Sequence, residues 1–199
     1  MKNFLHVGCG SQTKAGLRGF NTDEWNEIRF DIDEKVKPDI IGTLTDMRAV
    51  PSDSMDAIFS SHNIEHVFPH EVPMVLSEFY RVLKPEGFVV ITCPDLVSVC
   101  GAVAQGNLMD PLYVSPAGPI SAIDILYGHR GYIANGNVFM AHKCGFTYQS
   151  LVKGFFEAQF GNCFGGAVPE AYALWLVAFK NIAQEDVLRQ TAATFLPNV

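Results

Sequence analysis

The chain has 199 residues, of which 48% are hydrophobic and 18% charged, and its formal net charge is −7. This length and composition fit one globular domain, residues 1–199, with a single core. No stretch approaches the roughly 20 uninterrupted apolar residues that a membrane span needs. The first residues run directly into a glycine turn and leave no room for a signal peptide. We therefore expect a cytoplasmic protein without a membrane partner.

The acidic excess counts against DNA or RNA as a partner, because proteins that neutralise phosphates carry clusters of Lys and Arg and this sequence has none. Five cysteines are scattered without a Cys-x-x-Cys pair: Cys9, Cys93, Cys100, Cys144 and Cys163. An odd and dispersed set counts against both a disulfide framework and a thiolate zinc site. The sequence gives no indication of an oligomeric state.

Apolar runs of strand length recur through the first half of the chain, at residues 4–7, 27–31, 39–44, 56–60 and 88–92. Between the last two runs, apolar residues at near-helical spacing predict a helix over 71–83, which Lys84-Pro85-Glu86-Gly87 ends. Strands joined by crossover segments favour a parallel sheet covered on both faces.

The pattern changes after Pro94. Residues 95–145 hold seven glycines and three prolines and predict an inserted lid or substrate region, with short helices at 96–105 and 120–127. Beyond it the sequence predicts, in order, a helix at 147–160, strands at 163–168 and 173–179, and a weak helix with a frayed end in 181–199. The short gap between the last two strands predicts an antiparallel pair at the sheet edge.

A Gly8-Cys9-Gly10 turn follows the first predicted strand. Two glycines allow the backbone to turn sharply and a ligand to approach without meeting a Cβ atom. Asp31 ends the second predicted strand, 21 positions after Gly10. In nucleotide-binding βαβ units an acid at about this offset of 20 residues accepts hydrogen bonds from ribose hydroxyls. The alternatives are an ordinary turn and a solvated carboxylate at a strand end.

A further acid, Asp46, follows the third predicted strand, where the exocyclic amine of an adenine would need an acceptor, and Met47 beside it is suited to cover the adenine face. Together these features resemble the class I S-adenosylmethionine-dependent methyltransferases, in particular the branch called methyltransferase type 11. The resemblance runs from about Phe4 to Pro94 and more faintly to Lys180. Its motifs are Leu5-His6-Val7-Gly8-Cys9-Gly10, Phe30-Asp31-Ile32, Thr45-Asp46-Met47, the run from Ser54 to His62, Ile64-Glu65-His66, and Arg81-Val82-Leu83-Lys84-Pro85-Glu86-Gly87.

The resemblance implies an α/β fold: a Rossmann-like three-layer sandwich around a mostly parallel seven-stranded sheet with an antiparallel edge hairpin. It also implies S-adenosylmethionine as cofactor and S-adenosylhomocysteine as its product. The cofactor-binding residues that it implies are Gly8, Cys9 and Gly10 along the methionine part, Asp31 and Ile32 at the ribose, Asp46 and Met47 at the adenine, and Ser61 and His62 below the methyl group.

Three histidines and a glutamate lie within nine residues: His62, Glu65, His66 and His70. As letters, His62-x-x-Glu65-His66 matches an inverted zinc-protease signature. Such a zinc site would need one continuous helix and a third ligand from elsewhere, whereas Pro69 interrupts the segment. We therefore expect no metal, and expect Glu65 and His66 to pack the turn after the fourth strand. His62 ends that strand, where open α/β sheets bind their ligands.

If the methyl acceptor is a hydroxyl or a protonated amine, a base must remove its proton, and histidine suits this task near neutral pH. His62 and His129 are the candidate catalytic bases. Candidate acceptor contacts are Tyr113, Tyr127, His129 and Arg130, all in the predicted insertion. Arg130 indicates an anionic acceptor, because guanidinium pairs well with carboxylate or phosphate. The alternative is a folded lid whose tyrosines pack within it and do not contact an acceptor.

The leading hypothesis is O- or N-methylation of a small molecule. The alternative is a non-catalytic protein that binds S-adenosylmethionine or its product, for which His6 and Gln12 leave room, since the family usually has an acid or amide and a third glycine there. A nicotinamide-dependent dehydrogenase would predict a fuller Gly-x-Gly-x-x-Gly, but position 13 is Thr13. A zinc hydrolase is the remaining possibility.

Overall fold

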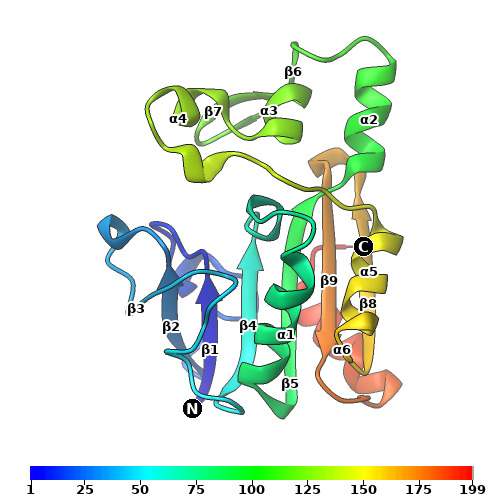
Figure 1. The fold of residues 1–199 in the computed structure, drawn as a ribbon. Coiled ribbons are helices and arrows are strands. Elements are labelled where there is room, and N and C mark those ends of the chain that lie inside the picture. The colour runs from blue at the N-terminus through cyan, green and yellow to red at the C-terminus, as the bar shows by residue number, and fades with distance from the viewer. Residues whose placement is uncertain (199) are drawn as a thin grey trace.

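The computed structural model describes residues 1–198 and contains a seven-stranded sheet in the order β3–β2–β1–β4–β5–β9–β8 (Figure 1). The parallel strands are β1 (Lys2–Val7), β2 (Trp25–Asp31), β3 (Ile40–Ile41), β4 (Met55–Ser61) and β5 (Leu83–Pro94). At the edge, β9 (Ala173–Phe179) runs antiparallel both to β5 and to β8 (Asn162–Val168). The mostly parallel sheet with an antiparallel edge pair is therefore confirmed.

Helices α1 (Val72–Val82) and α5 (Tyr148–Glu157) cover one face of the sheet (Figure 1). In α1 the buried residues Val75, Leu76, Phe79 and Val82 recur at helical spacing and pack on the strands, as an amphipathic helix must. Helix α5 begins at Thr147, whose hydroxyl accepts the backbone N–H of Ser150 at 3.2 Å. The predicted helices over 71–83 and 147–160 thus both form.

Helix α6 (Glu185–Phe195) covers the opposite face. Its buried residues Leu188, Ala192 and Phe195 lie four and three positions apart, so they form one apolar stripe. Leu196 beyond it is also buried. The helix predicted within 181–199 thus forms and packs on β8 and β9, and it ends at Phe195, while the last residue of the predicted frayed end lies outside the described residues.

No α-helix joins β1 to β2 within residues 8–24; a single 3-10 turn, η1 (Lys14–Gly16), lies there instead. Phe20 takes the place of the missing helix and is fully buried. Its ring stacks on Phe4 with centroids 4.2 Å apart and contacts Trp25, Phe59 and Phe195 at 5.0, 5.8 and 4.6 Å. Aromatic packing of this kind therefore ties the crossover segment to α6.

Three predicted boundaries differ. Helix α1 runs directly into β5 at Leu83, so the Lys84–Gly87 segment lies in the strand, beside a register shift between Met55 and Ala57. The third strand has only two residues, because the chain turns back at Thr43–Asp46, where the Asp46 N–H donates to Thr43 O at 3.1 Å. The predicted helix over 120–127 begins two residues late, after a strand.

The insertion, residues 95–145, stands over the carboxyl ends of the parallel strands (Figure 1). Its elements are α2 (Leu96–Ala104), the hairpin β6 (Pro111–Ser115) with β7 (Gly118–Ser121), α3 (Ala122–Tyr127), α4 (Arg130–Ala134) and η4 (Val138–Met140). Val99, Ile120, Ala122 and Ile125 form a small separate core. None of the helices in residues 1–198 is both long and apolar enough to span a membrane.

Candidate active site

The glycine turn after β1 has the left-handed backbone that only glycine adopts freely, with φ of 66° at Gly8 and 51° at Gly10. A Cβ atom at Gly8 would lie 2.3 Å from the side-chain nitrogen of Asn63, whereas at Gly10 it would meet no described atom within 4 Å. Gly8 therefore allows the turn to pack on the segment after β4. Gly10 leaves open space at the carboxyl end of the sheet.

Asp31 is held against this turn at the end of β2. Its Oδ2 accepts the Gly10 N–H at 2.8 Å and its Oδ1 accepts the Asp33 N–H at 2.9 Å. The residue is only 9% exposed. Each carboxylate oxygen keeps a further lone pair after these bonds. The carboxylate is thus fixed in orientation and still able to accept hydrogen bonds from a ligand.

A cavity of ≈390 Å³ opens beside Asp31, within the range of about 300–1,000 Å³ that small-molecule sites have. Five predicted cofactor residues line it: Gly8, Gly10, Asp31, Ile32 and His62. From the sheet, residues 42–45, Asn63 and His66 also contribute, and from the insertion Asn137, Phe139, Met140 and Lys143. The cavity therefore lies between the carboxyl ends of the strands and the insertion, and its glycine turn and fixed acid suit a nucleoside with a short side chain.

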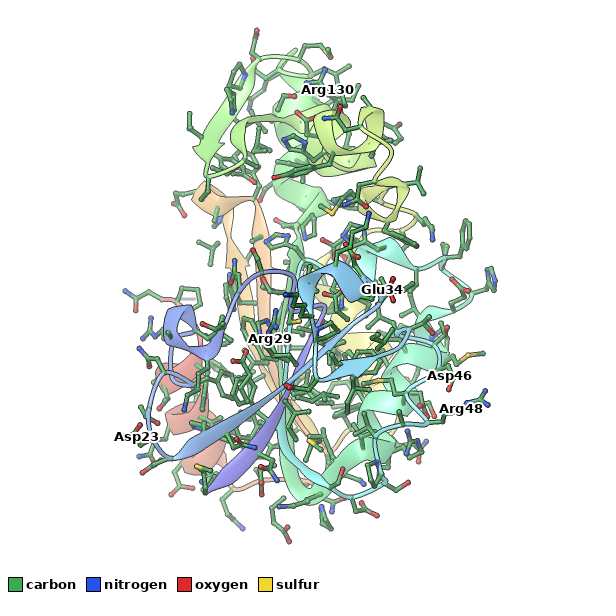
Figure 2. The ribbon with its side chains drawn as sticks, turned by 90° about the vertical axis from the view of Figure 1, so that its left-hand side faces the viewer. Asp23, Arg29, Glu34, Asp46, Arg48 and Arg130 are labelled. Carbon is green, nitrogen blue, oxygen red and sulfur yellow. The ribbon has the colours of Figure 1, made fainter. Side chains whose placement is uncertain are left out.

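Four other predicted cofactor residues do not line this cavity. Cys9 is buried behind the turn, and burial raises the pKa of its thiol to about 11. Met47 is fully buried in the core and Ser61 lies outside the lining. Asp46 points outward and pairs with Arg48 at 2.7 Å, and Figure 2 shows both at the surface. Asp46 and Met47 therefore lie outside the cavity lining, whereas residues 42–45, just before them, belong to it.

His6, where the resembling family usually has an acid or amide, is buried and forms a 2.7 Å contact from Nδ1 to Glu27 Oε1 on the neighbouring strand. The other oxygen of Glu27 accepts the Lys14 N–H at 2.9 Å. Burial lowers the pKa of His6, and although Glu27 raises it, the net shift is downward. The sequence analysis missed this pair, because nothing in the linear pattern joins His6 to a residue on the next strand.

Arg29 ties the turn to the segment after β2 (Figure 2). Its guanidinium donates to the carbonyls of Gly10, Val36 and Lys37, the last two at 3.2 and 2.9 Å. Two loops that border the cavity are thereby held by one side chain.

Glu65 lies below the cavity in η3 (Ile64–His66) and is fully buried. Among residues 1–198, neither of its carboxylate oxygens has a hydrogen-bond partner. Three imidazoles surround it: His62 Nδ1 is 3.5 Å and His142 Nε2 3.9 Å from Oε1, and His66 is close by. Burial raises the pKa of the Glu65 carboxyl. The three histidines together lower it by more, so the net shift is downward.

The four predicted acceptor contacts serve the insertion itself, and none of them lines the cavity among the described residues. Tyr113 stacks on Tyr172, and Tyr127 is exposed. His129 Nδ1 accepts the backbone N–H of Tyr132 at 3.2 Å. Arg130, near the top of the insertion in Figure 2, is paired with Asp124. The insertion residues that line the cavity are instead Asn137, Phe139, Met140 and Lys143, which were not predicted as acceptor contacts.

Arg130 holds α4 to α3 through Asp124. Its Nε donates to Oδ1 at 2.7 Å and its Nη2 to Oδ2 at 3.1 Å, while the Ser121 hydroxyl also donates to Oδ2 at 2.6 Å. The Arg130 guanidinium beside it holds the pKa of Asp124 well below its ordinary value. Such a two-pronged pair fixes geometry as well as charge.

We expect Asp124→Asn to lower the free energy of unfolding at pH 7 by about 1–3 kcal/mol, because a charged hydrogen-bond acceptor is lost in a buried network. A depressed pKa stabilises the fold above the unfolded value of about 3.9 and ceases to do so as the pH falls. The difference between wild type and variant, measured by urea unfolding, should therefore shrink below about pH 4. A difference that grows on acidification would contradict this assignment. Asp46→Asn, which breaks an exposed Asp–Arg pair, is the matched control and should change stability little.

The sheet order, with a glycine turn after β1, a fixed acid at the end of β2 and an antiparallel edge, defines the class I methyltransferase fold. A sequence profile described as "Methyltransferase domain" matches residues 5–91. This part of the chain is therefore similar to the type 11 methyltransferase domains, and the whole chain has the class I methyltransferase fold. S-Adenosylmethionine is the cofactor that this similarity implies.

Solved structures share the fold at low sequence identity. An S-adenosylmethionine-dependent methyltransferase from Methanosarcina mazei is 15% identical, with a TM-score of 0.59, and the match covers 92% of this chain and 93% of that one. The 1,6-didemethyltoxoflavin-N1-methyltransferase of Burkholderia thailandensis is 13% identical (TM-score 0.53; 91% and 72% covered). A candidate O-methyltransferase from Nostoc punctiforme is 11% identical, with a TM-score of 0.56. The match covers 89% of this chain and 52% of that one, so this chain spans about half of that protein. No curated protein matches the sequence.

Proposed function

We propose that this methyltransferase transfers the methyl group to a hydroxyl or amine of a small molecule that binds between the sheet and the insertion. The observation that carries this proposal is the shared cavity, in which the glycine turn, Asp31 and His62 of the sheet face Phe139 and Lys143 of the insertion. When bound, S-adenosylmethionine supplies a methyl group that is already activated on a sulfonium. The protein then has to position and desolvate the two reactants.

Three parts of the sheet edge would hold the cofactor. Asp31, with lone pairs left on both oxygens, is suited to the ribose hydroxyls. The turn at Gly8 and Gly10 admits the methionine part, because it presents backbone without side chains. Residues 42–45 border the remaining end of the cavity and are our candidates for the adenine.

The acceptor would contact the insertion. Phe139 and Met140 offer apolar surface, and Lys143, which lies over the Phe68 ring at 4.9 Å, offers a cation. Lys143 therefore replaces Arg130 as the candidate partner of an anionic acceptor. The cavity volume of ≈390 Å³ lies within the range of small-molecule sites. The methyltransferase from Burkholderia, whose structure holds 1,6-didemethyltoxoflavin, is an example of small-molecule methylation on this fold.

His62 is the one predicted base that lines the cavity. It follows β4 with a left-handed backbone, φ 47°, and its N–H binds Thr92 O at 2.9 Å. This conformation is uncommon outside glycine and is found at sites where the surrounding structure enforces it. The imidazole is 51% exposed, so it is accessible to an acceptor.

The test combines calorimetry with turnover. Wild-type protein should bind S-adenosylhomocysteine and methylate at least one member of a panel of small carboxylates, phenols, sugars and amines. His62→Ala should retain binding but lower turnover by about 100-fold or more, the usual contribution of a positioned base. His129→Ala, which lies outside the cavity, is the control and should keep wild-type turnover. A larger loss of turnover in His129→Ala than in His62→Ala would contradict the proposal. Cofactor binding without turnover on any acceptor would also contradict it.

A further inference from the structure

We propose that Glu65, His66 and His142 form a binding site for one divalent transition-metal ion, at the junction between the sheet and the insertion. One ligand atom from each of the three residues lies within 4.8 Å of the other two. This proposal does not depend on methyl transfer. It revises the expectation of no metal, which assumed that the ligands would have to share one helix.

The buried carboxylate is the first argument. Glu65 is 0% exposed, and within residues 1–198 neither of its oxygens accepts a hydrogen bond. A buried polar group without a partner is costly, and a buried carboxylate is found paired or bound to a metal. The imidazoles of His62 and His142, at 3.5 and 3.9 Å from Oε1, lie too far for good hydrogen bonds. A cation between them would satisfy the carboxylate.

The orientation of the two histidines is the second argument. His142 Nδ1 lies 2.7 Å from the carbonyl oxygen of Ile125, and His66 Nδ1 lies 3.1 Å from that of Ala141. A ring whose Nδ1–H donates to a carbonyl carries its lone pair on Nε2. Metal-bound histidines in proteins are held in this way, by a carbonyl or carboxylate on the other nitrogen. For His142, Nε2 is also the atom that faces Glu65.

The three ligand atoms, which lie within 4.8 Å of one another, would have to move closer together around an ion. Nitrogen and oxygen ligands about 2.1 Å from a tetrahedral metal lie about 3.4 Å apart. His142 Nε2 and Glu65 Oε1 are 3.9 Å apart. Two imidazoles and one carboxylate suit zinc or a neighbouring transition metal, whereas calcium and magnesium require mainly oxygen ligands. Three protein ligands also leave one coordination position free, for water or for His62.

Backbone hydrogen bonds hold the third ligand in place. The carbonyl of Glu65 accepts the N–H groups of Lys143 and Cys144, at 2.8 and 3.2 Å. The end of the insertion is thereby docked on η3, and His142 is presented to the carboxylate. Because His142 comes from the insertion and the other two ligands follow β4, a bound ion would fasten the insertion over the cavity that His66 also lines.

The experiment is a titration of metal-free full-length protein with ZnCl₂, followed by calorimetry and by the melting temperature. Wild type should bind one equivalent and melt at a higher temperature when loaded, because a ligand of the folded state stabilises it. Glu65→Gln and His142→Ala should each weaken binding by more than about tenfold, since even the loss of a supporting residue costs about 10–100-fold. His70→Ala, an exposed histidine outside the cluster, is the control and should bind like wild type.

The free cysteines require a second control, because Cys144 lies next to the site. Cys144→Ser should keep the bound equivalent, and the absorption spectrum of the Co²⁺-loaded wild type should lack thiolate charge-transfer bands. If a ligand variant does not fold, this spectrum of the wild type still shows whether a cysteine binds the ion. Absence of a bound equivalent in wild type, unchanged affinity in both ligand variants, or thiolate bands in the cobalt spectrum would each overturn the proposal.

Discussion

Asp31→Ala is expected to weaken binding of S-adenosylhomocysteine by at least about 100-fold. The carboxylate would accept two hydrogen bonds from the ribose, and hydrogen bonds to a charged group contribute about 1.5–3 kcal/mol each. Their joint loss of about 3 kcal/mol or more corresponds to a change in dissociation constant beyond 100-fold, at about 1.4 kcal/mol per factor of ten. The dissociation constant from calorimetry is the measurement.

Asp31 also accepts the N–H groups of Gly10 and Asp33, so its replacement removes two internal contacts as well. Asp31→Asn separates the two roles, because the amide keeps one acceptor oxygen and loses the charge. We expect this variant to lose less stability than Asp31→Ala, because one of the two internal contacts is kept, and still to bind far more weakly. Asp23→Ala, which removes an exposed aspartate at the far end of β2, is the matched control (Figure 2). Equal dissociation constants for Asp31→Ala and Asp23→Ala would refute the assignment.

Phe20→Ala is expected to lower the free energy of unfolding by about 3–5 kcal/mol, the usual cost of removing a buried aromatic ring. Phe20 is fully buried, and its ring contacts four others, on β1, β2, β4 and α6. The cost should fall at the high end of this range, because four aromatic rings surround the space that the substitution would empty. Urea unfolding followed by tryptophan fluorescence measures it.

Phe156→Ala provides the comparison, because Phe156 lies on α5 and is 50% exposed. A surface substitution of this kind is expected to change the free energy of unfolding by less than about 0.5 kcal/mol. A loss for Phe20→Ala as small as that for Phe156→Ala would show that the crossover segment is not part of the core.

The strands and the glycine turn were predictable from sequence because they depend on local patterns. Short β-branched and aromatic runs mark β1, β4 and β5, and Gly8 and Gly10 occupy a left-handed turn that their residue type alone favours. Asp31 was found through its spacing from Gly10, and the 2.8 Å contact between the two residues explains why that spacing is informative. The edge pair β8–β9 followed from a gap too short for a crossover.

What could not be predicted depends on contacts between distant segments. The packing of α6 was not predicted, because its apolar stripe is buried only where β9 and Phe20 come together in the folded chain. Arg130 was predicted to contact an anionic acceptor. In the structure its Nε and Nη2 both donate to Asp124, six residues before it. Similarly, Asp46 was predicted at the adenine, and in the structure it pairs with Arg48 at the surface.

The histidine cluster shows the same limit. His62, Glu65 and His66 were evident in the sequence, and the missing third partner was recognised as missing. His142 supplies it from the end of the insertion, which only the folded chain brings to Glu65. A linear motif can therefore report two ligands and leave the site incomplete.

A crystal structure with S-adenosylhomocysteine bound tests the central claim most directly. We expect the nucleoside in the ≈390 Å³ cavity, with its ribose hydroxyls on Asp31 and its sulfur facing the side occupied by His62. A nucleoside bound at any other place on the molecule, with the cavity beside Asp31 filled by solvent, would contradict it.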